Sequence, residues 1–244
     1  MAGKFSRPES MTDKTTHYCP GCGHGIIHRV MCEVIDELGI REKTVAVAPV
    51  GCAVLAYDYW NFDAIEAAHG RTPALATGIK RVLPDRVVFT YQGDGDLAAI
   101  GTAEIIHAGN RGEDLSVFFV NNGVYGMTGG QMAPTTLIGQ TTSTSQFTRR
   151  PDKEGYPLKI LEMMALLPGV VYLERTSIHS PAEVLKTRAA IKRSFETQLA
   201  GKGFSMVEIL SPCPTYWGMD PARSMERIRE KVIQQYPLGV VKNN

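Results

Sequence analysis

Two apolar runs separated by an amphipathic segment mark the middle of the chain. Residues 86–91 (RVVFTY) and 115–120 (LSVFFV) have the composition of buried strands, and residues 97–108 between them have that of a helix. Two strands joined by a crossover helix run parallel. Both strands therefore deliver the polar residues that follow them, Gly93-Asp94-Gly95 and Asn121-Asn122, to the same edge of one sheet.

The same alternation continues on both sides of this unit and predicts an α/β fold, a parallel sheet with helices on both faces. The polar ends of its strands are expected to converge on one edge. These ends are Gly51-Cys52, Asp94, Asn122 and Cys213. Helices are predicted over residues 25–38, 73–82, 158–167, 181–200 and 221–235, and further strands over 44–50, 170–174 and 204–210.

Several stretches carry no clear period. Residues 1–17 are interpreted as an extended arm, and the segment after Pro237 as a tail that is loose or lies on a partner. Residues 133–157 are polar and long for a loop, which is typical of a lid, a binding loop or a partner contact. Within it, Arg149-Arg150 is interpreted as a solvated tip in preference to an anion site. The whole chain, 1–244, is predicted to be one domain with this arm and a C-terminal helix and tail.

Composition excludes some classes of protein. The 26 basic and 25 acidic residues give a net charge of +1, so the chain lacks the basic footprint of a nucleic-acid-binding protein. No apolar stretch reaches the roughly 18 residues of a membrane span, and the first residues lack the apolar core of a signal peptide. A cytoplasmic location is expected. Cysteines there are usually reduced, so the odd count of 5 favours metal binding or catalysis over disulfides.

The ends of the two central strands carry oxygen ligands. Asp94 offers a carboxylate and Asn122 an amide oxygen, and such hard ligands suit Mg²⁺, which usually keeps phosphate oxygens as further ligands. Glycines beside Asp94 allow close approach to the backbone. Beyond Asn122, Gly126 and Gly129-Gly130 expose N–H groups that can face a diphosphate. The alternative interpretation is two ordinary turns.

Four of the five cysteines lie in loops that contain glycine or proline: Cys19 and Cys22 in CPGC, Cys52 in VGCA and Cys213 in SPCP. Four thiolates can hold a [4Fe–4S] cluster or a tetrahedral zinc ion. The spacing does not match the paired Cys-x-x-Cys of a zinc ribbon, but it leaves zinc, and also unliganded thiols, as alternatives. Cys32 lies inside a predicted helix and is interpreted as a core residue.

Taken together, the motifs YCPGCGHG, VGC, HGR, GDGD, NNGVYGMTGGQ and SPCPTYW closely resemble the β subunit of 2-oxoacid:ferredoxin oxidoreductases, over about residues 18–217. The resemblance implies a thiamine diphosphate (TPP)-binding fold. It implies Mg²⁺ ligation by Asp94, Asn122 and the carbonyl of Val124. It implies TPP contacts at Val50, Gly51, Cys52, Ala53, His69, Gly95, Asp96, Gly126 and Met127. It implies a [4Fe–4S] cluster on Cys19, Cys22, Cys52 and Cys213. From the residues alone, His69 has a structural role as an equal alternative.

The activity that the resemblance implies is oxidative decarboxylation of a 2-oxoacid to acyl-CoA and CO₂, with electrons passed to ferredoxin. TPP enzymes need a glutamate that activates the coenzyme, and none stands out here, because Glu104 is interpreted as structural. A separate α subunit, with γ and ferredoxin-like δ subunits, is therefore expected. Two alternatives remain: a cluster-free TPP carboligase or decarboxylase, and a non-catalytic iron–sulfur electron-transfer subunit. The 2-oxoacid is left open among 2-oxoglutarate, branched-chain 2-oxoacids, pyruvate and an aryl analogue.

Overall fold

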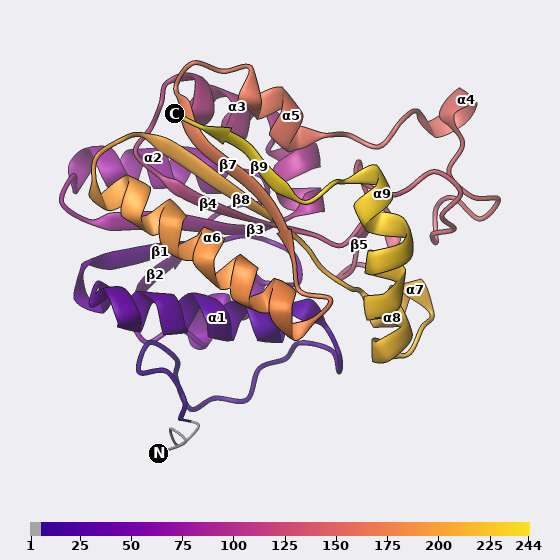
Figure 1. Cartoon of the computed structure of the whole chain (residues 1–244), viewed down its shortest axis with the longest axis horizontal. Coiled ribbons are helices and arrows are strands. Elements are labelled where there is room, and N and C mark those ends of the chain that lie inside the picture. Colours follow the sequence, from indigo (N-terminus) through magenta and orange to yellow (C-terminus); the bar gives the residue numbers. More distant parts are fainter. Residues whose placement is uncertain (1–5) are drawn as a thin grey trace.

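The computed structural model describes residues 6–244, and its central element is a seven-stranded sheet of order β2-β1-β3-β4-β8-β7-β9 (Figure 1). All neighbouring strands pair in parallel except β9, which runs antiparallel to β7. The predicted α/β architecture is confirmed. The strands are β1 (Thr44–Ala48), β2 (Asp63–Glu66), β3 (Val87–Gly93), β4 (Ser116–Asn121), β7 (Val170–Ser177), β8 (Phe204–Leu210) and β9 (Gly239–Asn243).

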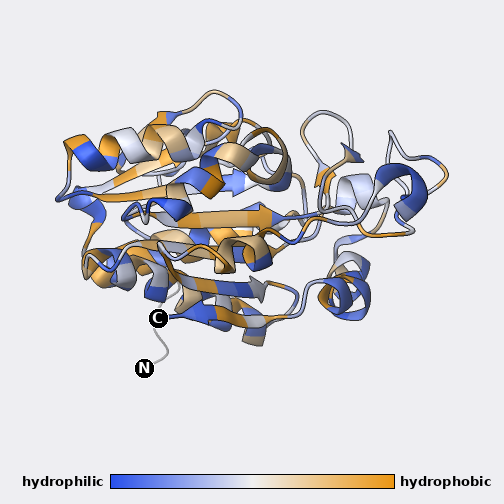
Figure 2. Ribbon diagram, turned by 90° about the horizontal axis from the view of Figure 1, so that it is seen from above, coloured by the Kyte–Doolittle hydropathy of each residue, from blue (hydrophilic) through white to orange (hydrophobic). Residues whose placement is uncertain are grey.

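Helices cover both faces of this sheet, so its central strands are buried on both sides. Helices α1 (Gly23–Leu38) and α6 (Pro181–Leu199) lie on one face. Helices α2 (Thr72–Val82), α3 (Thr102–Asn110) and α5 (Ile160–Ala165) lie on the other. Figure 2 shows hydrophobic residues concentrated between these layers. This burial explains why β3 and β4 are continuous apolar runs instead of alternating ones.

Aromatic rings join the sheet to α6. Phe195 of α6 packs edge-on against Phe89 and Phe118, with ring centroids 5.6 and 5.1 Å away. The helix begins at a cap in which the Ser180 hydroxyl accepts the N–H of Glu183, as the sequence predicts. These contacts fix the sheet at its centre, between the two strands whose ends carry the candidate ligands.

The sequence interpretation was wrong about the C-terminal tail and incomplete elsewhere. The tail beyond Pro237 forms β9 on the edge of the sheet. The edge strand β2 was not expected, because its side chains are mostly exposed and show no apolar run. The predicted helix 97–108 begins with a π-helical turn, Asp96–Ile100, before α3.

The remaining elements lie at one end of the molecule, beyond the carboxyl ends of the parallel strands (Figure 1). A hairpin of β5 (Val124–Tyr125) and β6 (Gln131–Met132) follows β4. A long loop then carries the short helix α4 (Pro151–Glu154) away from the sheet. The predicted helix 221–235 is divided into α8 (Pro221–Arg227), a π-helical turn, Ile228–Val232, and α9 (Ile233–Gln235), and α7 (Pro214–Trp217) precedes it.

The described part of the N-terminal arm, residues 6–17, lies against α1, where the Ser10 N–H and hydroxyl both donate to Asp36, and residues 1–5 of the predicted arm lie outside the described residues. Within residues 6–244, no helix combines the length and the apolar character needed to cross a bilayer.

Candidate functional site

A pocket of about 80 Å³ lies where β1, β3 and β4 end. Every residue that the sequence assigns to TPP or Mg²⁺ lines it: Val50, Gly51, Cys52, Ala53, His69, Asp94, Gly95, Asp96, Asn122, Val124, Gly126 and Met127. Its volume is below the ~300–1,000 Å³ that usually encloses an organic ligand. A coenzyme at this edge would therefore be held against the rim, with part of it left for another surface to cover.

Asp94 is the most constrained group in the pocket. It is 2% exposed. Its Oδ2 accepts hydrogen bonds from Gly123 N (2.7 Å) and Thr135 Oγ1 (2.8 Å), and its Oδ1 accepts one from Gly95 N (3.0 Å). Burial raises the pKa of Asp94 to about 6, and the three hydrogen bonds oppose that rise. No described lysine or arginine pairs with it. Such a carboxylate favours a bound cation.

The loop after β4 brings the other oxygen ligands to the same place. Asn122 Oδ1 accepts from Val124 N (3.1 Å), and the Asn122 carbonyl accepts from Trp217 Nε1 (3.1 Å). Gly123 between them has φ 71°, a conformation that favours glycine. A carboxylate, an amide oxygen and a nearby carbonyl are the hard donors that Mg²⁺ prefers, so these residues fit that ion.

His69 is held by the second aspartate of GDGD. Its Nδ1 lies 2.7 Å from Asp96 Oδ1, and Asp96 also accepts from Gly70 N (2.9 Å) and Gln92 Nε2 (2.7 Å). With Nδ1 engaged by the carboxylate, Nε2 is left for another partner. The structure thus orients His69 at the wall of the pocket, which favours a binding role over a merely structural one.

The four loop cysteines share one neighbourhood. A Cβ built on Gly126 would lie 2.9 Å from Cys52 Sγ and 3.7 Å from Cys213 Sγ, so both sulfurs border the same glycine. Cys22 N donates to the Cys19 carbonyl (3.0 Å) and closes the CPGC turn. Burial, with a smaller contribution from the neighbouring Cys19 and Cys22, raises the pKa of Cys52 to about 12 and that of Cys213 to about 11.

These sulfurs do not already form a coordination shell. Across residues 6–244, no three His, Cys, Asp or Glu side chains are grouped closely enough to hold a metal ion. The thiol donors match the chemistry of an iron–sulfur cluster, and a side chain at Gly126 would narrow the space between two of them.

Three other interpretations of single residues can be judged from the structure. Cys32 is fully buried in α1, which confirms it as a core residue, whereas Glu104 pairs with Arg71, and its structural role stays a prediction. Arg150 is exposed, as a solvated tip should be. Arg149 is 4% exposed, so its placement at the tip was wrong.

Sequence reasoning missed several residues of the pocket. His24 lines it and is 2% exposed, and its Nδ1 lies 2.7 Å from the Tyr91 hydroxyl. Its position directly after CPGC was a usable signal. Pro49, Tyr125 and Thr128 also line the pocket, and nothing in their types or spacing marks them.

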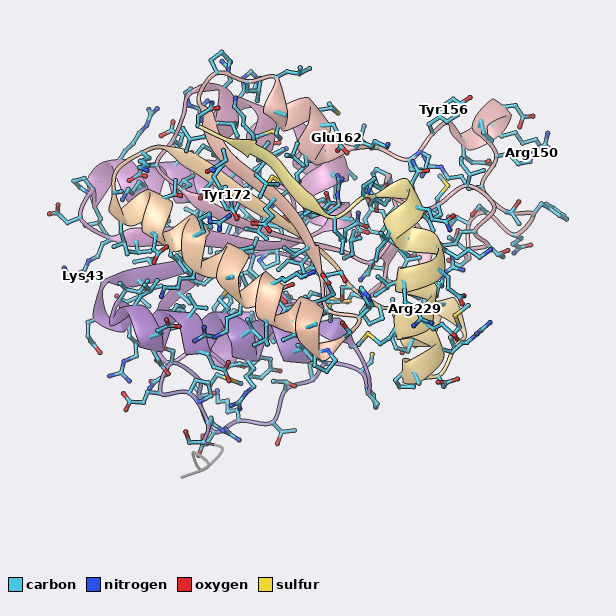
Figure 3. The ribbon with its side chains drawn as sticks, in the orientation of Figure 1. Lys43, Arg150, Tyr156, Glu162, Tyr172 and Arg229 are labelled. Atoms are coloured by element: carbon cyan, nitrogen blue, oxygen red, sulfur yellow. The ribbon has the colours of Figure 1, made fainter. Side chains whose placement is uncertain are left out.

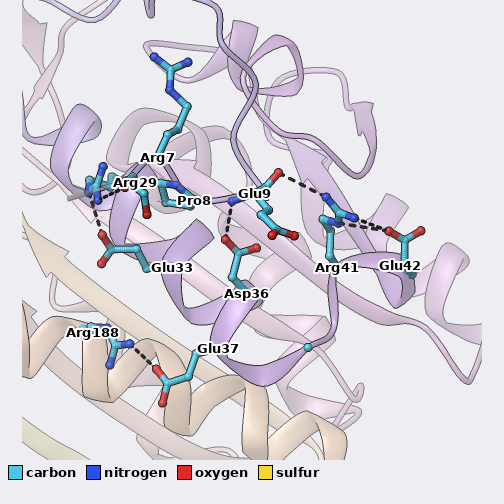
Figure 4. Close-up of a pocket in the computed structure, with 12 residues that line it drawn as sticks. Arg7, Pro8, Glu9, Arg29, Glu33, Asp36, Glu37, Arg41, Glu42 and Arg188 are labelled. Carbon is cyan, nitrogen blue, oxygen red and sulfur yellow. Dashed lines mark hydrogen bonds and ion pairs between the residues drawn. The ribbon is translucent and has the colours of Figure 1, made fainter. Parts of the chain in front are cut away.

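A larger surface cavity, about 770 Å³, lies at the other end of α1, beneath the N-terminal arm (Figure 4). Its walls carry both charge signs in contact, including the ion pair of Arg29 with Glu33 (2.8 Å) and that of Arg188 with Glu37. Such mutual neutralisation provides no field of one sign to attract a charged ligand. The candidate site is therefore the smaller pocket at the ends of the strands.

Comparison with known proteins agrees with this choice. The sequence model of a family described as "Thiamine pyrophosphate enzyme, C-terminal TPP binding domain" matches residues 49–209. That range includes the pocket residues from β1 to β4 and ends four residues before Cys213.

Two curated relatives cover most of the chain. Ketoisovalerate oxidoreductase subunit VorA of Methanothermobacter thermautotrophicus is 50% identical over 234 residues, which are 96% of this chain and 49% of that protein. 2-Oxoglutarate synthase subunit KorB of Methanocaldococcus jannaschii is 38% identical over 208 residues, 84% of this chain and 73% of that protein. The chain thus spans about half the length of its VorA relatives.

The fold also matches a solved structure, that of a 2-oxoglutarate:ferredoxin oxidoreductase from Magnetococcus marinus with 2-oxoglutarate, coenzyme A and succinyl-CoA bound. The TM-score is 0.79 at 24% identity, over 99% of this chain and 86% of that one. At this identity the likeness shows the fold alone.

Proposed function

Because the chain belongs to the thiamine pyrophosphate enzymes, and among them to the β subunits of 2-oxoacid:ferredoxin oxidoreductases, we propose that it is the TPP- and [4Fe–4S]-containing subunit of a coenzyme A-dependent enzyme of this kind. The overall reaction converts a 2-oxoacid and coenzyme A into acyl-CoA and CO₂ and passes two electrons to ferredoxin. The observation that carries the proposal is the buried Asp94, which has no cationic partner among the described residues and lies in a pocket with all the assigned coenzyme contacts.

The chain's own residues are proposed to bind the metal ion and to orient the coenzyme. Asp94, Asn122 and the Val124 carbonyl would hold Mg²⁺, and His69, hydrogen-bonded to Asp96 at the wall of the pocket, would face the coenzyme. Bound TPP supplies an electron sink for the loss of CO₂, and a bound cluster accepts single electrons.

The cluster is proposed to sit on Cys19, Cys22, Cys52 and Cys213. Cys52 contributes to both proposed sites. It lines the coenzyme pocket, and its sulfur also lies beside Gly126 together with that of Cys213. A cluster there would lie directly beside the coenzyme, which keeps the path for electron transfer short. Iron and acid-labile sulfide are expected in the purified protein at the level of one four-iron cluster.

The pocket is incomplete, which supports a partner. No glutamate is among the described residues that line it, so the activating carboxylate is proposed to come from an α subunit. Proposed γ and ferredoxin-like δ subunits complete the complex and pass electrons to ferredoxin. Turnover of 2-oxoacid by this chain alone would contradict this part of the proposal.

A branched-chain 2-oxoacid is the substrate that we favour. No lysine or arginine is among the described residues that line the pocket, whereas Val50, Val124 and Met127 offer apolar surface. A second carboxylate, as in 2-oxoglutarate, would have no cationic partner here. The relative with the higher identity quoted above is also named a ketoisovalerate oxidoreductase.

The decisive experiment is a substrate panel on the co-purified complex, with methyl viologen as electron acceptor. 2-Oxoisovalerate with coenzyme A is expected to give the highest kcat/KM and to bleach the cluster absorbance under anaerobic conditions. A higher kcat/KM for 2-oxoglutarate would overturn the substrate assignment. A cluster that stays oxidised with every 2-oxoacid would overturn the reaction.

A cluster-free TPP carboligase is the second candidate, because no three Cys, His, Asp or Glu side chains of residues 6–244 are grouped closely enough to hold a cluster. It predicts full TPP binding in protein that contains no iron or sulfide. A non-catalytic electron-transfer subunit predicts the reverse, iron without Mg²⁺-dependent TPP binding.

A further inference from the structure

The long polar loop after β6 returns to the pocket and contacts Asp94. Thr135 is 1% exposed, and its hydroxyl donates to Asp94 Oδ2 at 2.8 Å. The next residue, Thr136, donates to the Gly123 carbonyl (2.6 Å) and accepts from Ala133 N (2.9 Å). Two adjacent threonines thus hold both the carboxylate and the turn between the other two proposed ligands.

The two oxygens of the Asp94 carboxylate differ in how many hydrogen bonds they accept. Oδ2 of Asp94 is already engaged by Thr135 and by Gly123 N, whereas Oδ1 accepts only the N–H of the adjacent Gly95. Since a hydroxyl can donate only one proton, Thr135 engages Oδ2 alone. Oδ1, with a single protein donor, is then the oxygen with the greater capacity left to bind a further partner.

Arg149 holds the backbone around Thr135. Its guanidinium donates to the carbonyls of Pro134 (2.8 Å) and Thr136 (2.7 Å), one on each side of Thr135, and to that of Tyr156 (2.7 Å) across the loop. Its full set of acceptors is the carbonyls of Ala133, Pro134, Thr136, Glu154, Gly155 and Tyr156. A single side chain therefore ties the outgoing and returning halves of the loop together.

The chemistry of Arg149 is unusual for a surface loop. A buried cation without an anionic partner is costly, and no described carboxylate forms an ion pair with it. Five N–H donors in a planar fork suit several carbonyls at once, which a lysine cannot reproduce. Its neighbour Arg150 is exposed and pairs with Asp152 (2.5 Å), on the part of the loop that projects from the body (Figure 3).

The C-terminal segment supports Thr135 from a third side. Tyr236, which follows α9 and is 1% exposed, donates its hydroxyl to the Thr135 carbonyl at 3.0 Å. Its ring packs against the Arg175 guanidinium, 5.3 Å from the ring centroid. The position of Thr135 is thus fixed by packing as well as by the loop itself.

We propose that Thr135 and Arg149 are positioning residues for Mg²⁺. Arg149 fixes the backbone on both sides of Thr135, and the Thr135 hydroxyl holds Oδ2 of Asp94, which would leave Oδ1 for the ion. This inference rests on the proposed function, since it takes Asp94 as a Mg²⁺ ligand. Partners that orient a ligating carboxylate typically change metal affinity by about 10–100-fold when removed.

The test measures Mg²⁺-dependent binding of TPP to the co-purified complex. The method is titration calorimetry in the absence of substrate. T135V keeps the shape of the side chain and removes the hydroxyl, and it is expected to raise the apparent Kd for Mg²⁺ about 10–100-fold. T135S keeps the donor and is expected to restore most of the affinity. R149M is expected to weaken Mg²⁺ binding at least as much as T135V does. The matched control R150M is expected to bind Mg²⁺ as tightly as wild type.

Thermal unfolding of each variant without Mg²⁺ separates loss of affinity from loss of fold. A folded T135V that binds Mg²⁺ as tightly as wild type overturns the inference and leaves the proposed function intact. Equal weakening by T135V and T135S also overturns it, because the hydroxyl would then not be responsible. A wild-type complex that binds no TPP with Mg²⁺ refutes the proposed function, and the inference with it.

Discussion

Substitution of Asp94 by asparagine tests the central electrostatic claim about the site. Asp94 is a buried acid whose pKa rises from 3.8 to about 6 in the folded protein. Below its ordinary pKa the carboxyl is neutral in folded and unfolded chains alike, so it does not affect stability. As the pH rises from about 4 to about 6, the unfolded chain ionises first, and the folded state loses stability. The amide of an asparagine does not titrate, so D94N should lack this loss.

The size of the effect follows from the shift. One pKa unit corresponds to about 1.4 kcal/mol, so the change from 3.8 to about 6 amounts to about 3 kcal/mol of destabilisation above pH 6. The variant also disturbs hydrogen bonds at Gly123 and Thr135, but that contribution does not depend on pH. The quantity to compare is therefore the change in unfolding free energy with pH, not its value at one pH.

The assay is urea unfolding of the full-length chain without TPP and with EDTA, at several values between about pH 4 and about pH 7. Wild type is expected to lose about 3 kcal/mol more than D94N over this interval. With saturating Mg²⁺ and TPP the wild-type loss should disappear, while D94N should show no response to Mg²⁺. Parallel pH profiles for the two proteins without ligand would refute the claim that Asp94 is ionised against its environment.

Further substitutions address the proposed cluster and a buried ion pair of the sheet. C213A should lose most iron and acid-labile sulfide, whereas C32A, which removes a buried thiol of α1, should retain both by elemental analysis. G126A places a methyl group against two of the proposed cluster sulfurs and should also lower iron content, without loss of secondary structure by circular dichroism. E208A removes the buried partner of the Arg175 guanidinium at 2.7 Å but leaves its ion pair with Glu162, so it should cost about 1–3 kcal/mol in urea unfolding.

The ends of the central strands were predictable because they depend on local patterns. Apolar runs fixed β3 and β4, and the crossover rule placed Asp94 and Asn122 at one edge without any tertiary information. The pocket that contains them follows from that topology alone. The features that the sequence did not predict depend on contacts between residues distant in sequence. No local sequence pattern indicates such contacts.

Arg149 and β9 illustrate the two reasons for failure. The acceptors of Arg149 are backbone carbonyls, which every residue has, so no sequence feature marks its partners. Strand β9 has the polar sequence GVVKN and becomes a strand by pairing with β7 across more than sixty residues of chain. Edge strands of this kind lack the buried apolar pattern from which strands are recognised.

The instability of the empty site and its affinity for a cation have the same origin. About 3 kcal/mol is stored in an ionised Asp94 that the fold surrounds with donors but with no described positive charge. A cation that binds only the folded state relieves that cost, and this relief is part of its binding energy, so Mg²⁺ should stabilise the chain by an amount that its Kd and concentration determine. A substitution that relaxes Asp94 by admitting water should raise the stability of the empty protein and weaken Mg²⁺ together. The cost comes from burial, and the hydrogen bond from Thr135 reduces it, because that bond stabilises the ionised carboxylate.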